Sequence, residues 1–137
     1  MIVDTSALVA ITTGEWEWET LLAAISTNPT IMPAPVMTEL ELVVARRGPI
    51  ASAAAAGLID RMMKKGLSVV PFDQAHANIT VTARALYGKG NGRGGLLNFG
   101  DLMVYAVAKS RGEPLLCTGR DFASTDLEIH PASRLDP

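Results

Sequence analysis

The sequence MIVDTSALVAI, residues 1–11, places a carboxylate, Asp4, inside a stretch whose other side chains are apolar or small. Residues 1–4 are expected to form a short buried strand, and residues 6–11 the first turns of a helix. A charged group in such surroundings costs free energy unless it is hydrogen-bonded, paired with an opposite charge or bound to a metal ion. The position of Asp4 therefore raises the question of which other segments meet it where this strand ends.

The rest of the chain alternates predicted strands with predicted helices. Further strands are expected at 30–33, 67–71 and 114–118, and a fifth, weaker one at 127–129. Helices are expected at 15–26, 35–47, 49–66, 73–87 and 98–111. The strands are short and apolar on both faces, which is typical of a parallel sheet covered by helices on both sides. We therefore predict an α/β fold with three layers, α/β/α, around a short central parallel sheet of four to five strands.

Length and composition indicate one domain, which we assign to residues 1–137, with 48% hydrophobic side chains to build its core. The single cysteine, Cys117, lies in an apolar run, so we expect a core residue and a reducing, cytoplasmic setting. We find neither a signal peptide nor an apolar run of membrane-spanning length, and expect no membrane partner. The net charge of −2 argues against a globally basic nucleic-acid binder but permits local phosphate binding around metal-bound carboxylates.

Acidic residues recur in apolar surroundings at separate places in the chain. Asp4 and Asp121 follow predicted strands, and ligand sites in parallel sheets lie beyond the carboxyl ends of the strands. Asp101 lies in the first turn of a helix that is apolar all round, and Glu39 lies in another mostly apolar helix. Glu41 competes with Glu39, because helical periodicity places the apolar face only slightly nearer to Glu39.

Each of these acids also has a purely local explanation. Asp4 could cap the helix that follows it, Asp101 could form a capping box with Asn98, and Asp121 could bond Thr118 across a short turn. A cluster of four acids at one sheet edge would repel itself, however, and is tolerated at neutral pH mainly with a bound cation. Oxygen ligands without a histidine or cysteine cluster point to Mg²⁺ or Mn²⁺.

Two other features carry weaker signals. The glycine-rich loop at 88–95 matches neither a Walker loop nor a dinucleotide fingerprint, so it is either a surface loop or a place where Lys89 and Arg93 contact RNA phosphates. Arg46 belongs to a further basic group that is either solvated or RNA-binding. Trp16 and Trp18 lie about 200° apart on a helical wheel, so at least one of them is expected to be partly exposed.

The ordered set of these motifs resembles the PIN-domain ribonucleases, and more closely the VapC-type toxins of bacterial toxin–antitoxin pairs. The resemblance is carried by Ile2-Val3-Asp4-Thr5-Ser6-Ala7-Leu8, by Glu39 followed by Arg46-Arg47, by Leu97-Asn98-Phe99-Gly100-Asp101, and by Gly112-Glu113-Pro114-Leu115-Leu116 with Gly119-Arg120-Asp121-Phe122 and Thr125-Asp126. It implies that Asp4, Glu39, Asp101 and Asp121 are the catalytic, metal-binding acids, which selects Glu39 over Glu41. It also implies supporting roles beside the metal for Ser6, Thr118 and Asn98.

The activity implied by this resemblance is cleavage of RNA by a water activated on Mg²⁺ or Mn²⁺. The implied partners are a VapB-type antitoxin, an RNA substrate and a second copy of the chain. Two other classes of protein fit less well. An enzyme of the haloacid dehalogenase phosphatase type needs a second aspartate where Ser6 stands. A non-catalytic receiver domain of a signalling protein needs a lysine, for which Arg120 is a poor match. A PIN-like domain that binds RNA without cutting it stays open, as do the RNA target and the number of metal ions.

Overall fold

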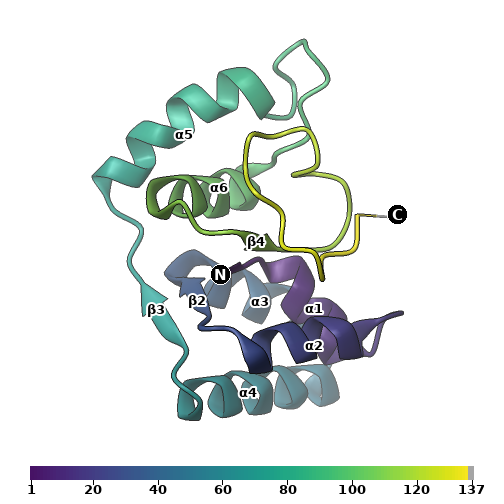
Figure 1. The fold of residues 1–137 in the computed structure, drawn as a ribbon. Helices are drawn as coiled ribbons and strands as arrows, with labels where there is room; N and C mark the ends of the chain where they lie inside the picture. The colour runs from purple at the N-terminus through teal and green to yellow at the C-terminus, as the bar shows by residue number, and fades with distance from the viewer. Residues whose placement is uncertain (136–137) are drawn as a thin grey trace.

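The structure, a computed structural model, describes residues 1–135 and contains four strands and six helices within that range. In chain order they are β1 (Ile2–Val3), α1 (Thr5–Thr13), α2 (Trp18–Thr27), β2 (Ile31–Pro33), α3 (Ala34–Ala45), α4 (Pro49–Lys64), β3 (Ser68–Val70), α5 (Gln74–Tyr87), α6 (Phe99–Arg111) and β4 (Leu115–Leu116). Figure 1 shows their arrangement. The predicted domain boundary at 137 lies outside the described residues.

The sheet is entirely parallel and has the order β3-β2-β1-β4. Strand β1 is central: Ile2 pairs with Ile31 of β2 on one side and with Leu115 of β4 on the other. The side chains of β1 and β4 are completely buried, as expected for strands covered on both faces. Because β1 and β4 are neighbours, the residues that follow them, including Asp4 and Asp121, come to one edge of the sheet.

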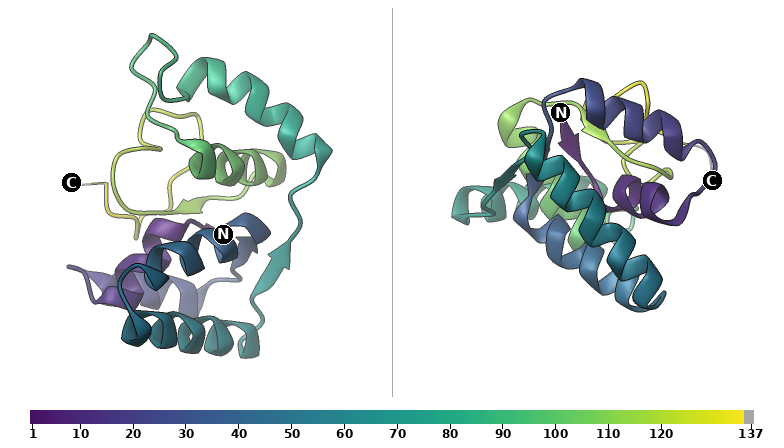
Figure 2. Two further views of the ribbon diagram at one scale, coloured as in Figure 1. Left: turned by 180° about the vertical axis from the view of Figure 1, so that it is seen from behind. Right: turned by 90° about the horizontal axis from the view of Figure 1, so that it is seen from below.

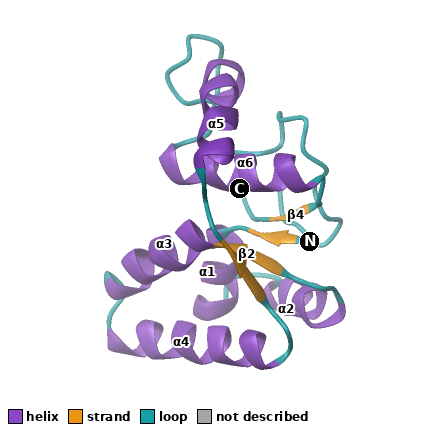
Figure 3. Cartoon of the chain, turned by 90° about the vertical axis from the view of Figure 1, so that its left-hand side faces the viewer, coloured by secondary structure: helices purple, strands orange, loops and turns teal. Residues whose placement is uncertain are grey.

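Helices cover both faces of the sheet, which confirms the predicted α/β/α layering. Figure 3 shows α5 and α6 on one side of the strands and α1 to α4 on the other. Helix α4 packs against α1 and α3 on the outside of its layer, as the views in Figure 2 show. Within residues 1–135, no helix is both long and apolar enough to cross a membrane.

The core lies between the sheet and these two helical layers. Its largest fully buried side chains come from β1, α1, α2, β2, α3, α6, β4 and the loops beside α6 and β4: Ile2, Val3, Leu8, Leu21, Met32, Val36, Val44, Leu97, Val104, Leu115, Leu116 and Phe122. Cys117 is also buried, as predicted. Each Å² of apolar surface that is removed from water stabilises the fold by about 25 cal/mol. These contacts therefore fix α1, α3 and α6 against the strand ends.

The helix predicted to begin at Glu15 begins instead at Trp18, so that part of the prediction was wrong. Gly14 adopts a left-handed conformation and ends α1, and the chain needs a turn before it can enter α2. Residues 15–17 form that turn, with Glu17 at a φ of 62°. Trp16 consequently projects from the turn and is 71% exposed, which agrees with the expectation for the tryptophan pair.

The fifth strand predicted at 127–129 is present only as an isolated parallel bridge between Leu115 and Ile129. A second bridge joins Thr118 to Arg134 further along the same edge. The C-terminal segment therefore follows β4 without forming a regular strand in the described residues. The two bridges nevertheless hold Ile129 and Arg134 against β4 and the start of the loop that carries Asp121.

Candidate active site

Asp4 lies where β1 ends and α1 begins, and its side chain is almost entirely buried, at 4% exposure. Its Oδ2 atom accepts hydrogen bonds from the backbone N–H of Ser6, at 3.0 Å, and from the Ser6 hydroxyl. The same hydroxyl accepts a hydrogen bond from the backbone N–H of Thr118 at 3.0 Å. The capping role predicted for Asp4 is therefore real, and Ser6 links this carboxylate to the end of β4.

Asp101 is held in the first turn of α6 by the capping box that its spacing from Asn98 predicts. The backbone N–H of Asn98 donates to Asp101 Oδ2, and the backbone N–H of Asp101 donates to Asn98 Oδ1, both at 2.9 Å. Asp101 is 8% exposed. The capping box explains the orientation of Asp101 but not the burial of its charge, since the helix dipole and the single amide of Asn98 that donates to the carboxylate offset only part of the desolvation cost.

Glu39 and Glu41, which helical periodicity could not separate, point to different surroundings on α3. Glu39 lines a pocket at the strand ends, and its Oε2 atom accepts a hydrogen bond from the hydroxyl of Thr5. Glu41 is exposed and lines a groove between α3 and α4. The structure therefore places Glu39, and not Glu41, beside the other acids.

Asp121 lies past the end of β4 and is the most exposed of the four predicted acids. It lines the same pocket as Asp4, Glu39 and Asp101. Its negative charge also raises the pKa of Asp101. Asp121 thus completes a group of acids drawn from β1, α3, α6 and the loop after β4.

Burial and mutual repulsion both act on the two most buried acids. Burial raises the pKa of Asp101 from 3.8 to about 7, and the charges of Asp4, Asp121 and Glu39 add to the shift. The pKa of Asp4 is raised to about 6, mainly by burial, while hydrogen bonds from Ser6 oppose the shift and Glu39 adds to it. Both carboxylates are thus in a setting in which a nearby positive charge would strongly favour their ionised forms.

The acids surround a pocket of about 290 Å³. Its lining consists of Asp4, Thr5, Ser6, Val9, Glu15, Glu39, Val43, Asn98, Asp101, Thr118 and Asp121. The side-chain atoms of this lining that could bind a metal are oxygens of carboxylates, hydroxyls and the Asn98 amide. Such a set suits Mg²⁺ or Mn²⁺ rather than zinc. Within residues 1–135, no three His, Cys, Asp or Glu side chains are placed to hold a metal ion by themselves. A cation here would rely on water for part of its coordination, as Mg²⁺ commonly does.

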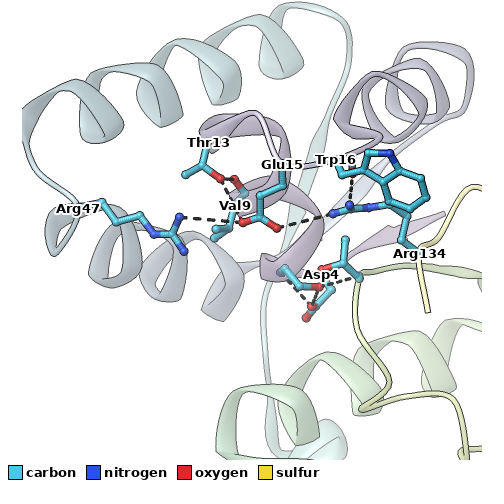
Figure 4. Close-up of polar contacts among 9 residues, drawn as sticks. Asp4, Val9, Thr13, Glu15, Trp16, Arg47 and Arg134 are labelled. Carbon is cyan, nitrogen blue, oxygen red and sulfur yellow. Dashed lines mark hydrogen bonds and ion pairs between the residues drawn. The ribbon is translucent and has the colours of Figure 1, made fainter. Parts of the chain in front are cut away.

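Three polar or charged side chains in or beside this pocket were not assigned a role from the sequence. Thr5 bonds Glu39, and its only sequence signal is its position next to Asp4. Glu15 lines the pocket because residues 15–17 form a turn rather than a helix. Arg134 approaches Glu15 from the C-terminal segment, as Figure 4 shows, and no local pattern marks this residue.

The basic residues predicted to contact RNA lie outside this pocket lining. Lys89 and Arg93 belong to the loop between α5 and α6, which Asn91 closes by accepting hydrogen bonds from the backbone N–H groups of Arg93, at 2.8 Å, and Gly95, at 3.1 Å. Arg46 caps the end of α3 and is exposed. A role in RNA binding stays a prediction for all three.

Comparison with known proteins places this arrangement in context. A family model described as PIN domain matches residues 1–128. Ribonuclease VapC36 of Mycobacterium tuberculosis is 45% identical over 133 residues, covering 94% of this chain and 92% of that protein. Ribonuclease VapC42 of the same species is 40% identical over 134 residues, covering 96% of this chain and 98% of that protein.

Solved structures share the fold at lower sequence identity. VapC20 of Mycobacterium tuberculosis, described as a toxin that cleaves the sarcin-ricin loop, has a TM-score of 0.70 at 22% identity, covering 95% of this chain and 98% of that one. A toxin–antitoxin complex from Klebsiella pneumoniae contains a chain with a TM-score of 0.67 at 18% identity, covering 95% of this chain and 96% of that one. These likenesses concern the fold.

Proposed function

Because the chain belongs to the PIN domain family, among its VapC ribonucleases, we propose that it is a Mg²⁺- or Mn²⁺-dependent endoribonuclease and the toxin of a toxin–antitoxin pair. The observation that carries this proposal is the meeting of Asp4, Glu39, Asp101 and Asp121 in one pocket at the carboxyl edge of a parallel sheet. Their mutual repulsion and burial favour a bound cation, and a cation beside a pocket open to solvent can bind a phosphodiester.

In this proposal Asp4, Asp101 and Asp121 would hold the metal together with bound water, and Glu39 would either bind it or orient a water molecule. When bound, the cation would neutralise charge on the scissile phosphate and make an attacking water more acidic. Ser6 holds the Asp4 carboxylate through its hydroxyl and backbone N–H. These contacts preorganise the acids before RNA arrives, which reduces the reorganisation that the reaction requires.

Two further contacts orient Asp101 and Glu39. Asn98 fixes Asp101 through the reciprocal hydrogen bonds of the capping box, so this carboxylate keeps one oxygen for another partner. Thr5 donates to Glu39 from the first residue of α1, next to Asp4. Asp4, Glu39 and Asp101 are thus each oriented by another residue of the pocket lining.

The partners are proposed from the named relatives. Solved neighbours include a toxin–antitoxin complex and the VapBC2 proteins of Rickettsia felis bound to DNA from their promoter. We propose that this chain likewise binds a VapB-type antitoxin, forms a homodimer and acts in the cytoplasm. Co-purification with the product of an adjacent short reading frame would test the antitoxin assignment.

The activity is tested with purified protein and total cellular RNA in Mg²⁺, in Mn²⁺ and in EDTA. Asp4→Asn and Asp101→Asn keep the size of each side chain but remove a charge, and each is expected to lower cleavage at least about 100-fold. Asp60→Asn is the matched control, because Asp60 is exposed on α4 and only pairs with Lys64 at 2.9 Å. Undiminished cleavage by both site variants would refute the assignment, and RNA binding without any cleavage would favour a non-catalytic PIN-like domain.

A further inference from the structure

A fifth acid at the pocket is flanked by two arginines. The carboxylate of Glu15 lies 4.0 Å from Arg47 Nη1 and 3.7 Å from Arg134 Nη2, and Glu15 itself lines the acidic pocket. Figure 4 shows Glu15 between the two guanidinium groups, with Asp4 nearby. Two positive charges therefore stand beside a pocket whose ionisable lining residues are all acidic.

Arg134 is anchored to the strand end that also leads to Asp121. Its backbone N–H donates to the Cys117 carbonyl at 3.1 Å, and its own carbonyl accepts from the Gly119 N–H at 2.7 Å. Its side chain is 12% exposed and also donates to the Trp16 carbonyl. An arginine held in this way loses little side-chain entropy when it binds an anion.

Arg47 reaches the same place from the end of α3, the helix that carries Glu39. Its side chain is half exposed, and Glu15 is 43% exposed between the two arginines. Glu15 also accepts a hydrogen bond from the Thr13 hydroxyl at 3.1 Å. The three side chains carry a net charge of +1, so the rim attracts anions although the pocket behind it repels them.

The ion pairs of Glu15 are loose. Close, charge-assisted contacts between nitrogen and oxygen are about 2.7–2.9 Å long, and exposed pairs at greater distances contribute little to stability. A phosphate group is negatively charged and, like a carboxylate, presents a pair of oxygens that arginine binds in a forked geometry. A phosphate could therefore replace Glu15 at small cost.

We propose that Arg47 and Arg134 form a subsite for an RNA backbone phosphate next to the one that is cleaved, and that Glu15 occupies this subsite in the free protein. The RNA phosphate displaces the carboxylate, which swings away from both arginines. The subsite holds a polyanion at a pocket lined by five carboxylates, where the substrate would otherwise be repelled. This inference rests on the proposed function only for the identity of the ligand as RNA.

If Glu15 occupies the subsite in the free protein, removing its charge should strengthen RNA binding. The probe is a fluorescein-labelled, unstructured single-stranded RNA of mixed sequence, and binding is followed by fluorescence anisotropy in EDTA. Glu15→Gln is expected to tighten binding about three- to tenfold. Glu41→Gln is the matched control, since it removes one exposed acidic charge from α3 outside the pocket and should change binding much less.

The arginines are tested by the salt dependence of the same binding. Arg134→Ala is expected to weaken binding about tenfold and to reduce the slope of log K against log salt by about 0.7, the change for one lost phosphate contact with a single strand. Arg134→Lys should keep the slope and recover only part of the affinity, because lysine keeps the charge without the fork. Arg111→Ala, at the exposed far end of α6, is the matched control.

The two levels of the proposal fail in different ways. Weaker binding by Glu15→Gln, a slope for Arg134→Ala equal to that of Arg111→Ala, or no RNA binding by the wild-type protein would each overturn the subsite. If Mg²⁺-dependent cleavage persists while the slope is unchanged, the proposed function stands and the subsite is wrong. If the binding results are as expected but no RNA is cleaved in Mg²⁺ or Mn²⁺, the two arginines still bind an RNA phosphate and the nuclease assignment is wrong.

Discussion

The backbone of Gly100 lies against the carboxylate of Glu39, so that a β-carbon at Gly100 would collide with Glu39 Oε1 and lie 3.0 Å from Cδ. Gly100 is in the first turn of α6, next to Asp101, and Glu39 is in the middle of α3. The absence of a side chain at this one position allows the two acid-bearing helices to approach each other. The relation between Gly100 and Glu39 therefore controls where one of the four acids points.

Gly100→Ala is expected to displace the Glu39 carboxylate and to lower RNA cleavage about tenfold or more, since displacement of a catalytic group by about 1 Å can cost that much or more. Stability should change little, because alanine favours a helix by up to about 1 kcal/mol over glycine and so offsets part of the strain. Cleavage rates and thermal unfolding of the same preparation separate the two effects.

Gly57→Ala is the control for that experiment. Gly57 lies inside α4, and a β-carbon there would meet only the end of the flexible Arg61 side chain, at 3.4 Å. Its cleavage rate should match that of the wild-type protein. Equal activity of Gly100→Ala and Gly57→Ala would mean that the position of Glu39 is unimportant for cleavage.

The burial of Asp101 predicts that stability without metal falls as pH rises. The pKa of Asp101 is about 7 in the folded chain and 3.8 ordinarily, so between about pH 4 and 7 the folded state binds more protons than the unfolded state. The stability contributed by the protonated acid is full below that range and is lost by about pH 8. Urea unfolding in EDTA at several pH values measures this slope.

Asp101→Asn should flatten this pH dependence and stabilise the protein at pH 8 in EDTA by about 1–3 kcal/mol. The amide oxygen of asparagine can still accept the hydrogen bond from the Asn98 N–H, so the capping box is kept. Adding Mg²⁺ at pH 8 should stabilise the wild-type protein and not the variant. A variant that is less stable than wild type at pH 8, with the same slope, would show that the Asp101 charge is already compensated within the chain.

A polar contact outside the pocket lining gives an opposite pH dependence. Asp126 accepts hydrogen bonds from Lys109 Nζ at 2.6 Å and from the hydroxyl of the buried Tyr105 at 2.7 Å, and these contacts lower its pKa. The stability that they contribute is present above about pH 4 and is lost as pH falls below it. Asp126→Asn should cost about 0.5–1 kcal/mol at pH 7, because the carboxylate is partly exposed and screened.

The cost of Asp126→Asn should shrink at pH 3, where the wild-type carboxylate becomes protonated. Denaturant unfolding at the two pH values provides the measurement. Asp60→Asn on α4, which breaks an exposed pair with Lys64, should cost less at pH 7. Equal costs of Asp126→Asn at pH 7 and pH 3 would show that the charge of Asp126 contributes nothing to stability.

Much of this site follows from short-range sequence signals. Asp4 is marked by the apolar residues around it, and the spacing of Asn98 and Asp101 specifies a capping box that the structure contains. The alternation of strands and helices specifies a parallel sheet, whose carboxyl edge is where ligands bind. Glu39 was separated from Glu41 only by family resemblance, because the helical period alone gives them nearly equal claims.

The remaining parts depend on tertiary contacts that no local pattern encodes. The run of acids at 15–19 is a normal start for a helix, and the left-handed Gly14 that delays α2 to Trp18 takes Glu15 to the pocket instead. Arg134 reaches Glu15 only because the C-terminal segment bonds to Cys117 and Gly119. Such contacts between distant segments determine which charged side chains meet beside the pocket. The residue types near each position do not predict these contacts.

The loop between α5 and α6 provides a last test, which concerns RNA binding outside the pocket. Lys89→Ala combined with Arg93→Ala should weaken binding of the single-stranded RNA probe in EDTA and reduce its salt slope by about 1.4, if each side chain contacts one phosphate. The fold of the loop should survive, because its closure depends on the Asn91 side chain and on the hydrogen bond between Lys89 N–H and the Leu97 carbonyl at 2.8 Å. Asn91→Ala is the informative companion: it keeps both charges but loosens the loop, so it should weaken binding without changing the slope. A double variant with an unchanged slope would assign the glycine-rich loop a purely structural role.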